Sequence, residues 1–430
     1  MQKVLIITYY WPPAGGPGVQ RWLKFVKYLR DFNIEPVVYV PENPHYPLID
    51  KSFENEIPSD ITVIKKPIKE PYQLAGVFSK KESKTISSGI IKDEKEQGLL
   101  QKMMLWVRGN LFIPDARMFW VKPSVKFLLS YLNEHQIETV ITTGPPHSLH
   151  LIGKQLKEKL AVNWIADFRD PWTKIGYHHK LKLTKASQKK HLKLEKEVLQ
   201  TADHLLTTSF TTKKDFSAIT KQPISVITNG YDDDEIEQVK LAEKFRISHI
   251  GSLLSERNPK HLWQALRELT QENQEFKKDF ELVLAGKVSE TVINSIKANG
   301  LENCLIEKGY LSHEESLIQQ RKAQVLLLIE IDKEETQGII PGKFFEYLKA
   351  SRPILAIGPK NWDVIRLIEE TQAGSYFGYL AKKEIKHQIY SWYQLYKQGK
   401  LLSEVSTEKM DQFHRKNLTR KLASVIQQFN

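Results

Sequence analysis

Short apolar runs alternate with helical patterns along nearly the whole chain, and this alternation is what most limits the fold. Strand-like runs include "KVLIITYY", "EPVVYV" and "TVITTG" early in the chain, and "RISHIGS", "FELVLAG" and "VLLLIE" later. Segments with apolar residues three or four positions apart, such as "SLHLIGKQLKEKL" and "HLWQALRELTQ", separate most of them. Strands that alternate with helices are typical of parallel sheets covered by helices on both faces. The predicted fold class is therefore α/β.

The number of strand-like runs exceeds what one domain comfortably holds, so we predict two doubly wound, Rossmann-like domains. The division falls near "KQPISVITNGYDDDEIEQ", which combines a proline, an Asn-Gly turn and an acidic run. We therefore assign 1–225 to a first domain and 226–400 to a second. The segment 79–100 is polar and rich in Lys, Glu and Ser, and is predicted to be a mobile excursion. The last segment, 401–430, contains an amphipathic helix that is expected to pack back on the first domain.

Charge and composition narrow the classes of partner. The chain has 430 residues and a formal net charge of +12, which favours anionic partners. Its lysines are spread along the chain, without zinc-finger spacing, RNP-type strands or a heptad zipper, so no nucleic-acid partner is predicted. No run of about 18 apolar residues is present, so no membrane span is expected. The single cysteine, Cys304, excludes an internal disulfide and a Cys-based metal cluster, and suits a cytoplasmic location.

Polar residues and glycines follow the strands of the first half, where doubly wound sheets bind ligands. Gly15 and Gly16 lack a Cβ, so their N–H groups can face a phosphate, although a turn with positive φ is the structural alternative. His147 stands where a helix starts, and its neutral imidazole can accept a proton or bond a sugar hydroxyl, or be structural. Asp167 and Arg169 crowd the end of "NWIADF", either to act in a reaction or to brace a loop.

The stretch "HIGSLLSERNPKHL" places cations between a strand and a helix in the second half. Gly251 ends the strand, and Arg257 and Lys260 follow it before the helix begins. Cations at this position suit a diphosphate. This stretch therefore predicts one wall of an anion site.

The stretch "EETQGIIPGKFFEYLKASRPILAIG" predicts a second wall. Pro341 suits the first helical turn, and the helix N-terminus at Gly342 offers free N–H groups and the positive end of a dipole. Lys343 adds a positive charge there. Glu346 lies about one turn on, on the same side, where its carboxylate can accept hydrogen bonds from two ribose hydroxyls. The structural alternative for Glu346 is a surface residue on a core helix.

These pieces, in this order, resemble the family 4 (GT4) glycosyltransferases of the GT-B fold over nearly the whole chain. The resemblance rests on "PPAGGPGVQR", "GPPHS", "ADFRDPW", "TNGYD", "HIGSLLSERNPKHL" and "IIPGKFFEYLKASRPIL". It implies two Rossmann-like domains facing an interdomain cleft, with the nucleotide mainly on the C-terminal domain and the acceptor mainly on the N-terminal one. It also implies sugar transfer from a nucleotide-sugar with retention, with no metal and no other cofactor.

The resemblance assigns roles to individual positions. The glycine loop against the diphosphate falls at Gly15 and Gly16, the active-site histidine at His147, the diphosphate cation at Arg257, and the second glutamate of E-x7-E at Glu346. The predicted catalytic set is His147, Asp167 and Arg169, and the predicted donor site adds Gly251, Lys260, Pro341, Gly342 and Lys343. Two positions depart from the family pattern: Ser252 replaces an arginine, and Gly338 replaces the first glutamate of E-x7-E.

The acceptor side has a weaker signature. Lysine- and arginine-rich segments carry Trp106, Phe112, Phe119 and Trp120, and "HHKLKLTKASQKKHLKLEKE" adds a basic helix. Such surfaces suit docking to an anionic membrane surface, and a solvated helix beside core aromatics is the alternative. We therefore expect a glycan or lipid-linked acceptor at the inner membrane face, in surface polysaccharide or lipopolysaccharide biosynthesis.

Two other functions fit the same fold. A nucleotide-sugar epimerase acts on the nucleotide-sugar alone, without an acceptor. A non-catalytic nucleotide-sugar-binding protein is favoured by Ser252 and Gly338.

Overall fold

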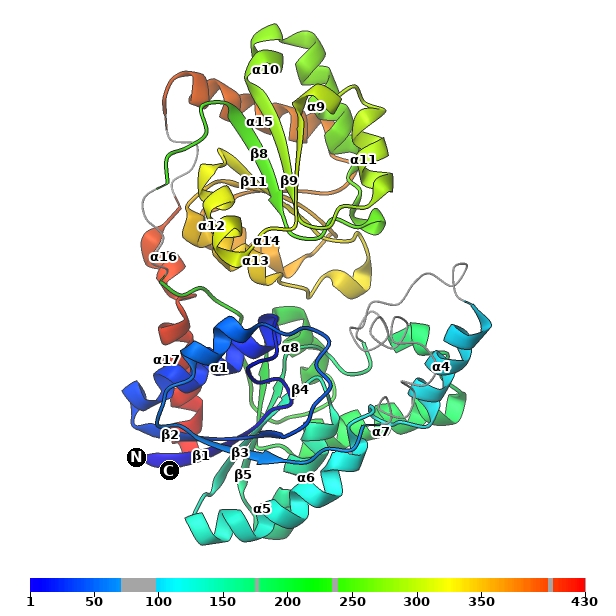
Figure 1. The fold of residues 1–430 in the computed structure, drawn as a ribbon, viewed down its shortest axis with the longest axis vertical. Coiled ribbons are helices and arrows are strands. Elements are labelled where there is room, and N and C mark those ends of the chain that lie inside the picture. Colours follow the sequence, from blue (N-terminus) through cyan, green and yellow to red (C-terminus); the bar gives the residue numbers. More distant parts are fainter. Residues whose placement is uncertain (71–97, 175–177, 234–238, 401–404, 430) are drawn as a thin grey trace. The chain divides into compact units, whose positions relative to one another are not determined.

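The chain divides into two compact units in a computed structural model that describes residues 1–70, 98–174, 178–233, 239–400 and 405–429. Unit 1 comprises Met1–Thr228 and Arg415–Asn430, and unit 2 comprises Asn229–His414 (Figure 1). The predicted excursion at 79–100 falls, from 79 to 97, outside the described residues.

Unit 1 is built on a seven-stranded parallel sheet in the order β3-β2-β1-β4-β5-β6-β7. Its strands are β1 Gln2–Ile7, β2 Ile34–Pro41, β3 Thr62–Lys66, β4 Thr139–Gly144, β5 Asn163–Phe168, β6 His204–Thr207 and β7 Ile224–Val226. Its helices are α1 Pro17–Leu29, α4 Leu99–Asn110, α5 Val121–His135, α6 Ser148–Leu160, α7 Lys185–Thr201, α8 Phe210–Ser217 and α17 Arg415–Ile426.

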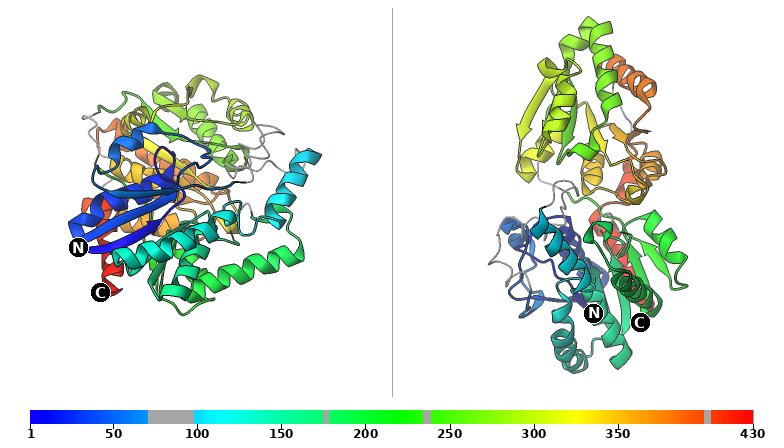
Figure 2. Two further views of the ribbon diagram at one scale, coloured as in Figure 1. Left: turned by 60° about the horizontal axis from the view of Figure 1, so that its bottom comes forward. Right: turned by 90° about the vertical axis from the view of Figure 1, so that its right-hand side faces the viewer.

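The central strands of unit 1 are apolar on both faces because helices cover both. Val4 and Ile6 of β1 face a cluster that includes Val26 of α1 and Leu422 of α17. Leu5 and Ile7 face the opposite way, into a cluster with α5 and α6. The ribbon views show helices on both faces of the unit 1 sheet (Figure 2). The C-terminal helix α17 thus packs beside α1 within unit 1.

Unit 2 is built on a six-stranded parallel sheet in the order β10-β9-β8-β11-β12-β13. Its strands are β8 Phe245–Ile250, β9 Phe280–Ala285, β10 Leu305–Gly309, β11 Val325–Ile329, β12 Ile354–Ile357 and β13 Gly374–Phe377. Its helices are α9 Lys260–Glu272, α10 Gln274–Asp279, α11 Glu290–Lys297, α12 His313–Lys322, α13 Gly342–Ala350, α14 Asp363–Thr371, α15 Lys382–Lys397 and α16 Thr407–Asp411.

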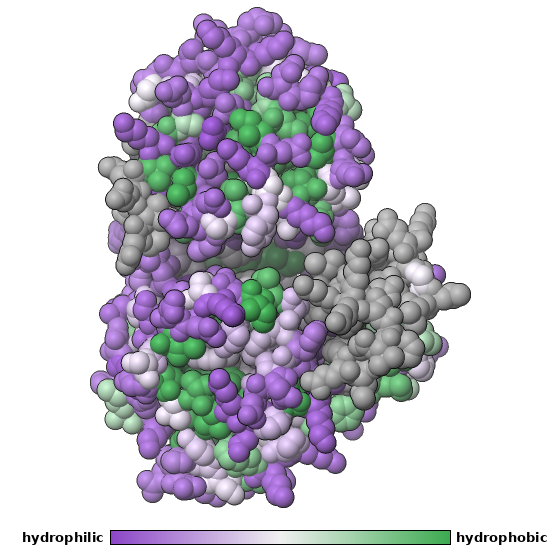
Figure 3. All heavy atoms as spheres, in the orientation of Figure 1, coloured by the Kyte–Doolittle hydropathy of each residue, from purple (hydrophilic) through white to green (hydrophobic). Residues whose placement is uncertain are grey.

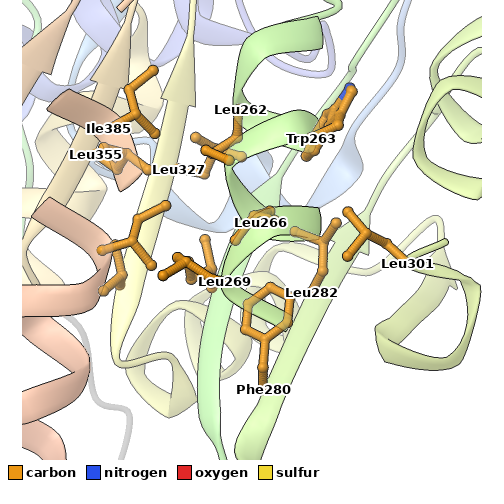
Figure 4. Close-up of a cluster of buried hydrophobic side chains, with 14 of the residues drawn as sticks. Leu262, Trp263, Leu266, Leu269, Phe280, Leu282, Leu301, Leu327, Leu355 and Ile385 are labelled. Atoms are coloured by element: carbon orange, nitrogen blue, oxygen red, sulfur yellow. The ribbon is translucent and has the colours of Figure 1, made fainter. Parts of the chain in front are cut away.

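Helix α9 shows how the predicted periodicity becomes packing. Leu262, Leu266 and Leu269 recur every three to four residues and so lie on one face, where all are buried. This face points at the sheet, toward Leu282 and Leu327 (Figure 4). With two parallel sheets covered by helices, the α/β prediction is confirmed.

Some large apolar residues reach the surface, among them Met103, Leu111 and Leu380. On the face drawn in Figure 3, green apolar residues form small groups among purple polar ones. Among the described residues, no helix is both long and apolar enough to cross a membrane.

Candidate active site

The carboxyl ends of β8 and β9 approach each other closely in unit 2. Gly251 and Gly286 follow these strands with φ of +117° and +114°, which favours glycine. The N–H of Gly251 donates to the carbonyl of Ala285 at 2.7 Å. A Cβ on Gly286 would lie 2.5 Å from the carbonyl oxygen of Gly251, so no larger residue fits. The two glycines leave a backbone edge without side chains at the end of the sheet where α/β proteins bind ligands.

Lys343 extends over this edge from α13. The helix begins at Gly342, and Pro341 is its N-cap residue rather than a member of its first turn. The Nζ of Lys343 lies 3.4 Å from Nε2 of His249, and 2.7 Å from where a Cβ on Gly251 would be. Burial lowers the pKa of Lys343 to about 8, and the nearby charge of Arg257 acts in the same direction. A cation therefore lies at the end of β8, beside the N-terminus of a helix.

Arg257 provides a second cation, held by a buried carboxylate. Its Nε and Nη2 donate to Oε1 of Glu330 at 3.0 and 2.8 Å. The side chain of Glu330 is 1% exposed and that of Arg257 is 26% exposed, so the guanidinium retains contact with solvent. Glu330 directly follows β11, and sequence reasoning missed it because it reads as the polar end of an apolar strand.

Glu346 lies further along α13 and is oriented by a neighbouring helix. Its Oε2 accepts a hydrogen bond from Nε2 of Gln320 on α12 at 2.8 Å. Gln320 is 1% exposed, so it is a fixed donor. The charge of Glu346 acts on Lys343, which places the two side chains near each other.

The structure brings together Gly251, Arg257, Lys343 and Glu346 from the predicted donor set. Lys260 is the first residue of α9 and is exposed. His249 was missed by sequence reasoning, although a histidine inside the apolar run "RISHIGS" is a signal that could have found it.

In unit 1, the two predicted glycines have different environments. The N–H of Gly15 donates to the carbonyl of Leu48 at 3.0 Å, so the prediction that this N–H faces a phosphate needs correction. A Cβ on Gly15 would lie 2.9 Å from Cγ of Leu48, which explains the glycine structurally. Gly16 has a φ of +98° and is the N-cap residue of α1.

His147 lies at the start of α6, packed among the rings of His150, Phe168 and Trp172. Its imidazole stacks on Trp172, with centroids 5.0 Å apart and planes 3° apart. Both ring nitrogens are buried and have no hydrogen-bond partner among the described residues. Burial lowers the pKa of His147 well below 6.5, and His150 and Arg169 add to this effect. The ring is therefore neutral near pH 7 and has unused hydrogen-bonding capacity.

Asp167 and Arg169 have separate roles in unit 1. Asp167 is fully buried and accepts hydrogen bonds from Arg21, Trp22 and Thr143. Arg21 also donates to the carbonyls of Ile227 and Thr228, so this network ties α1 to β5 and to the end of the unit. These contacts identify Asp167 as a bracing residue.

Arg169 instead turns back toward the end of β4. Its Nε lies 3.3 Å from the carbonyl oxygen of Gly144, and its Nη2 donates to the carbonyl of Pro145. Its guanidinium also lies over the ring of Tyr10, 5.7 Å from the centroid. Arg169 therefore adds a positive charge next to the His147 loop.

No metal site is evident in the parts of the chain that the structure describes. They contain no group of three or more His, Cys, Asp or Glu side chains that could hold a metal ion. The positively charged groups at the strand ends of unit 2 are Arg257, Lys343 and the N-terminus of α13, and these groups could bind an anion.

The two parallel sheets and their strand order define the chain as a protein of the GT-B fold, which confirms that part of the resemblance. No family model matches the sequence, and no curated protein matches it either. Solved structures do match over the full length. HepE of Anabaena, solved in complex with UDP, aligns with a TM-score of 0.62 at 12% identity and covers 100% of both chains.

Two further structures show how broad the similarity is. WaaG, a glycosyltransferase involved in lipopolysaccharide biosynthesis, aligns with a TM-score of 0.56 at 12% identity, covering 98% of this chain and 99% of WaaG. A putative UDP-N-acetylglucosamine 2-epimerase from Listeria monocytogenes aligns with a TM-score of 0.53 at 14% identity, covering 99% of this chain and 95% of its own. At these identities the similarity shows the fold, and function must be argued from the site.

Proposed function

We propose that the chain is a retaining, metal-independent glycosyltransferase that uses a nucleotide-sugar donor. The observation that carries this proposal is the cluster at the strand ends of unit 2. Two cations, Arg257 and Lys343, lie beside the N-terminus of α13, and an oriented carboxylate, Glu346, lies one turn further along. Two cations and a helix N-terminus suit a diphosphate, and the carboxylate suits a ribose. The match to HepE, which was solved with UDP, supports the same ligand class.

The chemistry follows from where charge develops. As the bond between the anomeric carbon and the diphosphate breaks, the electron pair moves to the departing phosphate oxygen. Arg257, Lys343 and the N–H groups at Gly342 stabilise this charge in place of a metal ion. The acceptor hydroxyl forms the new glycosidic bond and passes its proton to a phosphate oxygen of the donor. Glu346 fixes the nucleoside and so holds the donor in register.

We assign sugar handling in unit 1 to His147 and Arg169. The unused nitrogens of His147 suit a sugar hydroxyl, and Trp172 fixes the plane of the ring. Arg169 supplies a positive charge beside this loop. We assign Asp167 a structural role and not a role in the reaction, because it accepts hydrogen bonds from Arg21 and Trp22.

For the acceptor, we propose a glycan or lipid-linked substrate at the cytoplasmic face of a membrane. Helix α4 exposes Met103 and Trp106, which are 58% and 42% exposed. Hydrogen bonds between Asn110 and the backbone at Lys182 and Thr184 link α4 to the start of α7. Helix α7 buries Ser187, His191, Glu195 and Val198 on one face, which leaves a lysine-rich face outward. Apolar and basic side chains on neighbouring elements suit an anionic lipid surface.

Vesicle flotation tests this docking surface. The protein should float with vesicles of phosphatidylglycerol and phosphatidylcholine at low salt, and not with phosphatidylcholine alone. The variant Lys189→Glu with Lys193→Glu should lose flotation, whereas Lys297→Glu with Lys308→Glu on unit 2 should retain it. Equal flotation of both variants would contradict the proposed surface.

Calorimetric titration of UDP, GDP and ADP, beside the variant Glu346→Ala, tests the donor site. We expect micromolar binding of one nucleotide, weakened in the variant. If none binds, the proposal is wrong. The epimerase alternative is favoured by the match to the Listeria structure, and product analysis separates the two: a new glycoside supports transfer, and an epimer in the absence of acceptor supports the alternative.

A further inference from the structure

His249 is a close neighbour of the Lys343 side chain. It is a fully buried residue of β8, and its Nδ1 lies 2.9 Å from the carbonyl oxygen of Leu327. A carbonyl can only accept, so Nδ1 carries the proton of the neutral ring. The other nitrogen, Nε2, is then an acceptor, and it lies 3.4 Å from Nζ of Lys343.

The ring is neutral for a physical reason. Burial lowers the pKa of His249 well below 6.5, and the charge of Lys343 acts in the same direction. The backbone of Leu327 and of Ser252 favours the protonated ring, but burial outweighs this effect. Near pH 7, His249 therefore offers Lys343 a lone pair instead of a second positive charge.

Gly251 makes the room that this arrangement needs. A Cβ at this position would lie 2.7 Å from Nζ and 3.2 Å from Cε of Lys343. The positive φ of Gly251 reinforces the requirement for glycine. The ammonium thereby reaches the end of β8, next to Ser252, whose own side chain is uncharged.

The charges around Lys343 leave its protonation finely balanced. Arg257 disfavours the charged amine, while Glu330 and Glu346 favour it. Burial is the largest influence, and the pKa of Lys343 falls to about 8. An acceptor within reach of Nζ favours the protonated amine, since only the ammonium form has all three N–H donors.

We propose that His249 is a positioning residue: its Nε2 accepts a hydrogen bond from Lys343 and holds the ammonium, protonated, toward the diphosphate of the donor. This inference rests on the proposed function, in which Lys343 binds that diphosphate. His249 itself does not touch the substrate.

Substitutions at 249 separate positioning from packing. The amide of glutamine in His249→Gln reaches the place of Nε2, whereas the shorter amide in His249→Asn lies near Nδ1. We expect the affinity of His249→Gln for the best-binding of UDP, GDP and ADP to stay within about threefold of wild type. His249→Asn and His249→Leu should bind it at least about tenfold more weakly, the size of a lost hydrogen bond to a charged group. Equal loss in all three variants would overturn the proposal.

A double-mutant cycle tests whether His249 acts through Lys343. The double variant His249→Leu with Lys343→Met should bind no more weakly than Lys343→Met alone. The matched control, His249→Leu with Arg257→Met, should show the product of the two single losses. Multiplicative losses in both double variants would mean that His249 does not act through Lys343.

The pH dependence and a ligand-free measurement complete the test. Binding to the wild type should weaken as pH rises through about 8, because Lys343 loses its proton there while phosphate, with a pKa of about 6, stays ionised. In His249→Leu this midpoint should move to lower pH. The rate of acylation of Lys343 against pH reports the same shift without nucleotide. An unmoved acylation profile overturns the positioning role, whereas failure of all three nucleotides to bind overturns the proposed function.

Discussion

The substitution Asp167→Asn distinguishes a bracing residue from a reacting one. The carboxylate of Asp167 is completely buried and accepts from Nη2 of Arg21 at 2.9 Å, from Nε1 of Trp22 at 2.8 Å and from Oγ1 of Thr143 at 2.8 Å. Asparagine has the same shape, but its NH2 group would face at least one of these donors. The Arg21 side chain is 1% exposed, so its charge would also lose its counter-ion where water cannot replace it.

The expected cost follows from burial. Removing one partner of a buried ion pair costs about 3–5 kcal/mol, because the remaining charge is left uncompensated. For a unit of this size, each kcal/mol lowers the unfolding midpoint by about 2–4 °C. Asp167→Asn should therefore lower the unfolding midpoint of unit 1 by roughly 10 °C, while the affinity for the best-binding nucleotide, which we propose to bind unit 2, stays unchanged.

Hydrogen exchange measured peptide by peptide is the appropriate assay, since a protein with two units need not unfold in one step. Peptides from α1 and β5 should lose protection, while peptides from β8 and β11 serve as an internal reference. The double variant Arg21→Met with Asp167→Leu should recover part of the loss, because no charge is then buried alone. If Asp167→Asn retains full protection but abolishes transfer, Asp167 takes part in the reaction and the bracing argument is refuted.

Three further predictions concern binding and pH. In calorimetry, Glu346→Ala should reduce the affinity for the best-binding nucleoside diphosphate at least about tenfold, because a hydrogen bond to a charged group is lost. The control Glu369→Ala, at an exposed position, should leave this affinity unchanged. Gly251→Ala should reduce the affinity for the same ligand, because the added Cβ would lie 2.7 Å from Nζ of Lys343. In the control Gly378→Ala the added Cβ meets no atom within 4 Å, and binding should be normal. Burial lowers the pKa of His150 to about 3. Below about pH 6.5 this histidine is therefore protonated in the unfolded chain but still neutral in the folded one. In urea unfolding of unit 1, the free energy of unfolding should decrease as the pH is lowered below about 6.5, by up to about 1.4 kcal/mol per pH unit for this histidine. The variant His150→Gln should reduce this slope.

Each of these expectations has a contradicting result. Unchanged affinity in Glu346→Ala would show that the carboxylate does not face the nucleotide. Normal binding by Gly251→Ala would show that Lys343 does not need the space above the end of β8. A stability of unit 1 that is constant from pH 7 to pH 5 would show that His150 titrates normally in the folded chain.

Much of the architecture was contained in the sequence. Parallel strands joined by helices bring every carboxyl end to one edge of a sheet, so the sequence alone places Arg257, Lys343 and Glu346 near one another. The periodicity of Leu262, Leu266 and Leu269 likewise predicted a helix with one buried face. These inferences work because strand alternation and helical spacing are local properties of the chain.

What only the tertiary structure decided is which polar groups are already in use. Asp167 looked like a reacting carboxylate until Arg21, 146 residues earlier in the chain, was found bound to it. The N–H of Gly15 looked free until the carbonyl of Leu48 was found to accept from it. Conversely, His249 looked like part of an apolar strand until Lys343 was found beside its Nε2. Partners so distant in sequence leave no local pattern, since a hydrogen bond depends on where the fold brings two groups. The sequence could therefore nominate candidate site residues, whereas only the fold showed which of their polar groups already have partners.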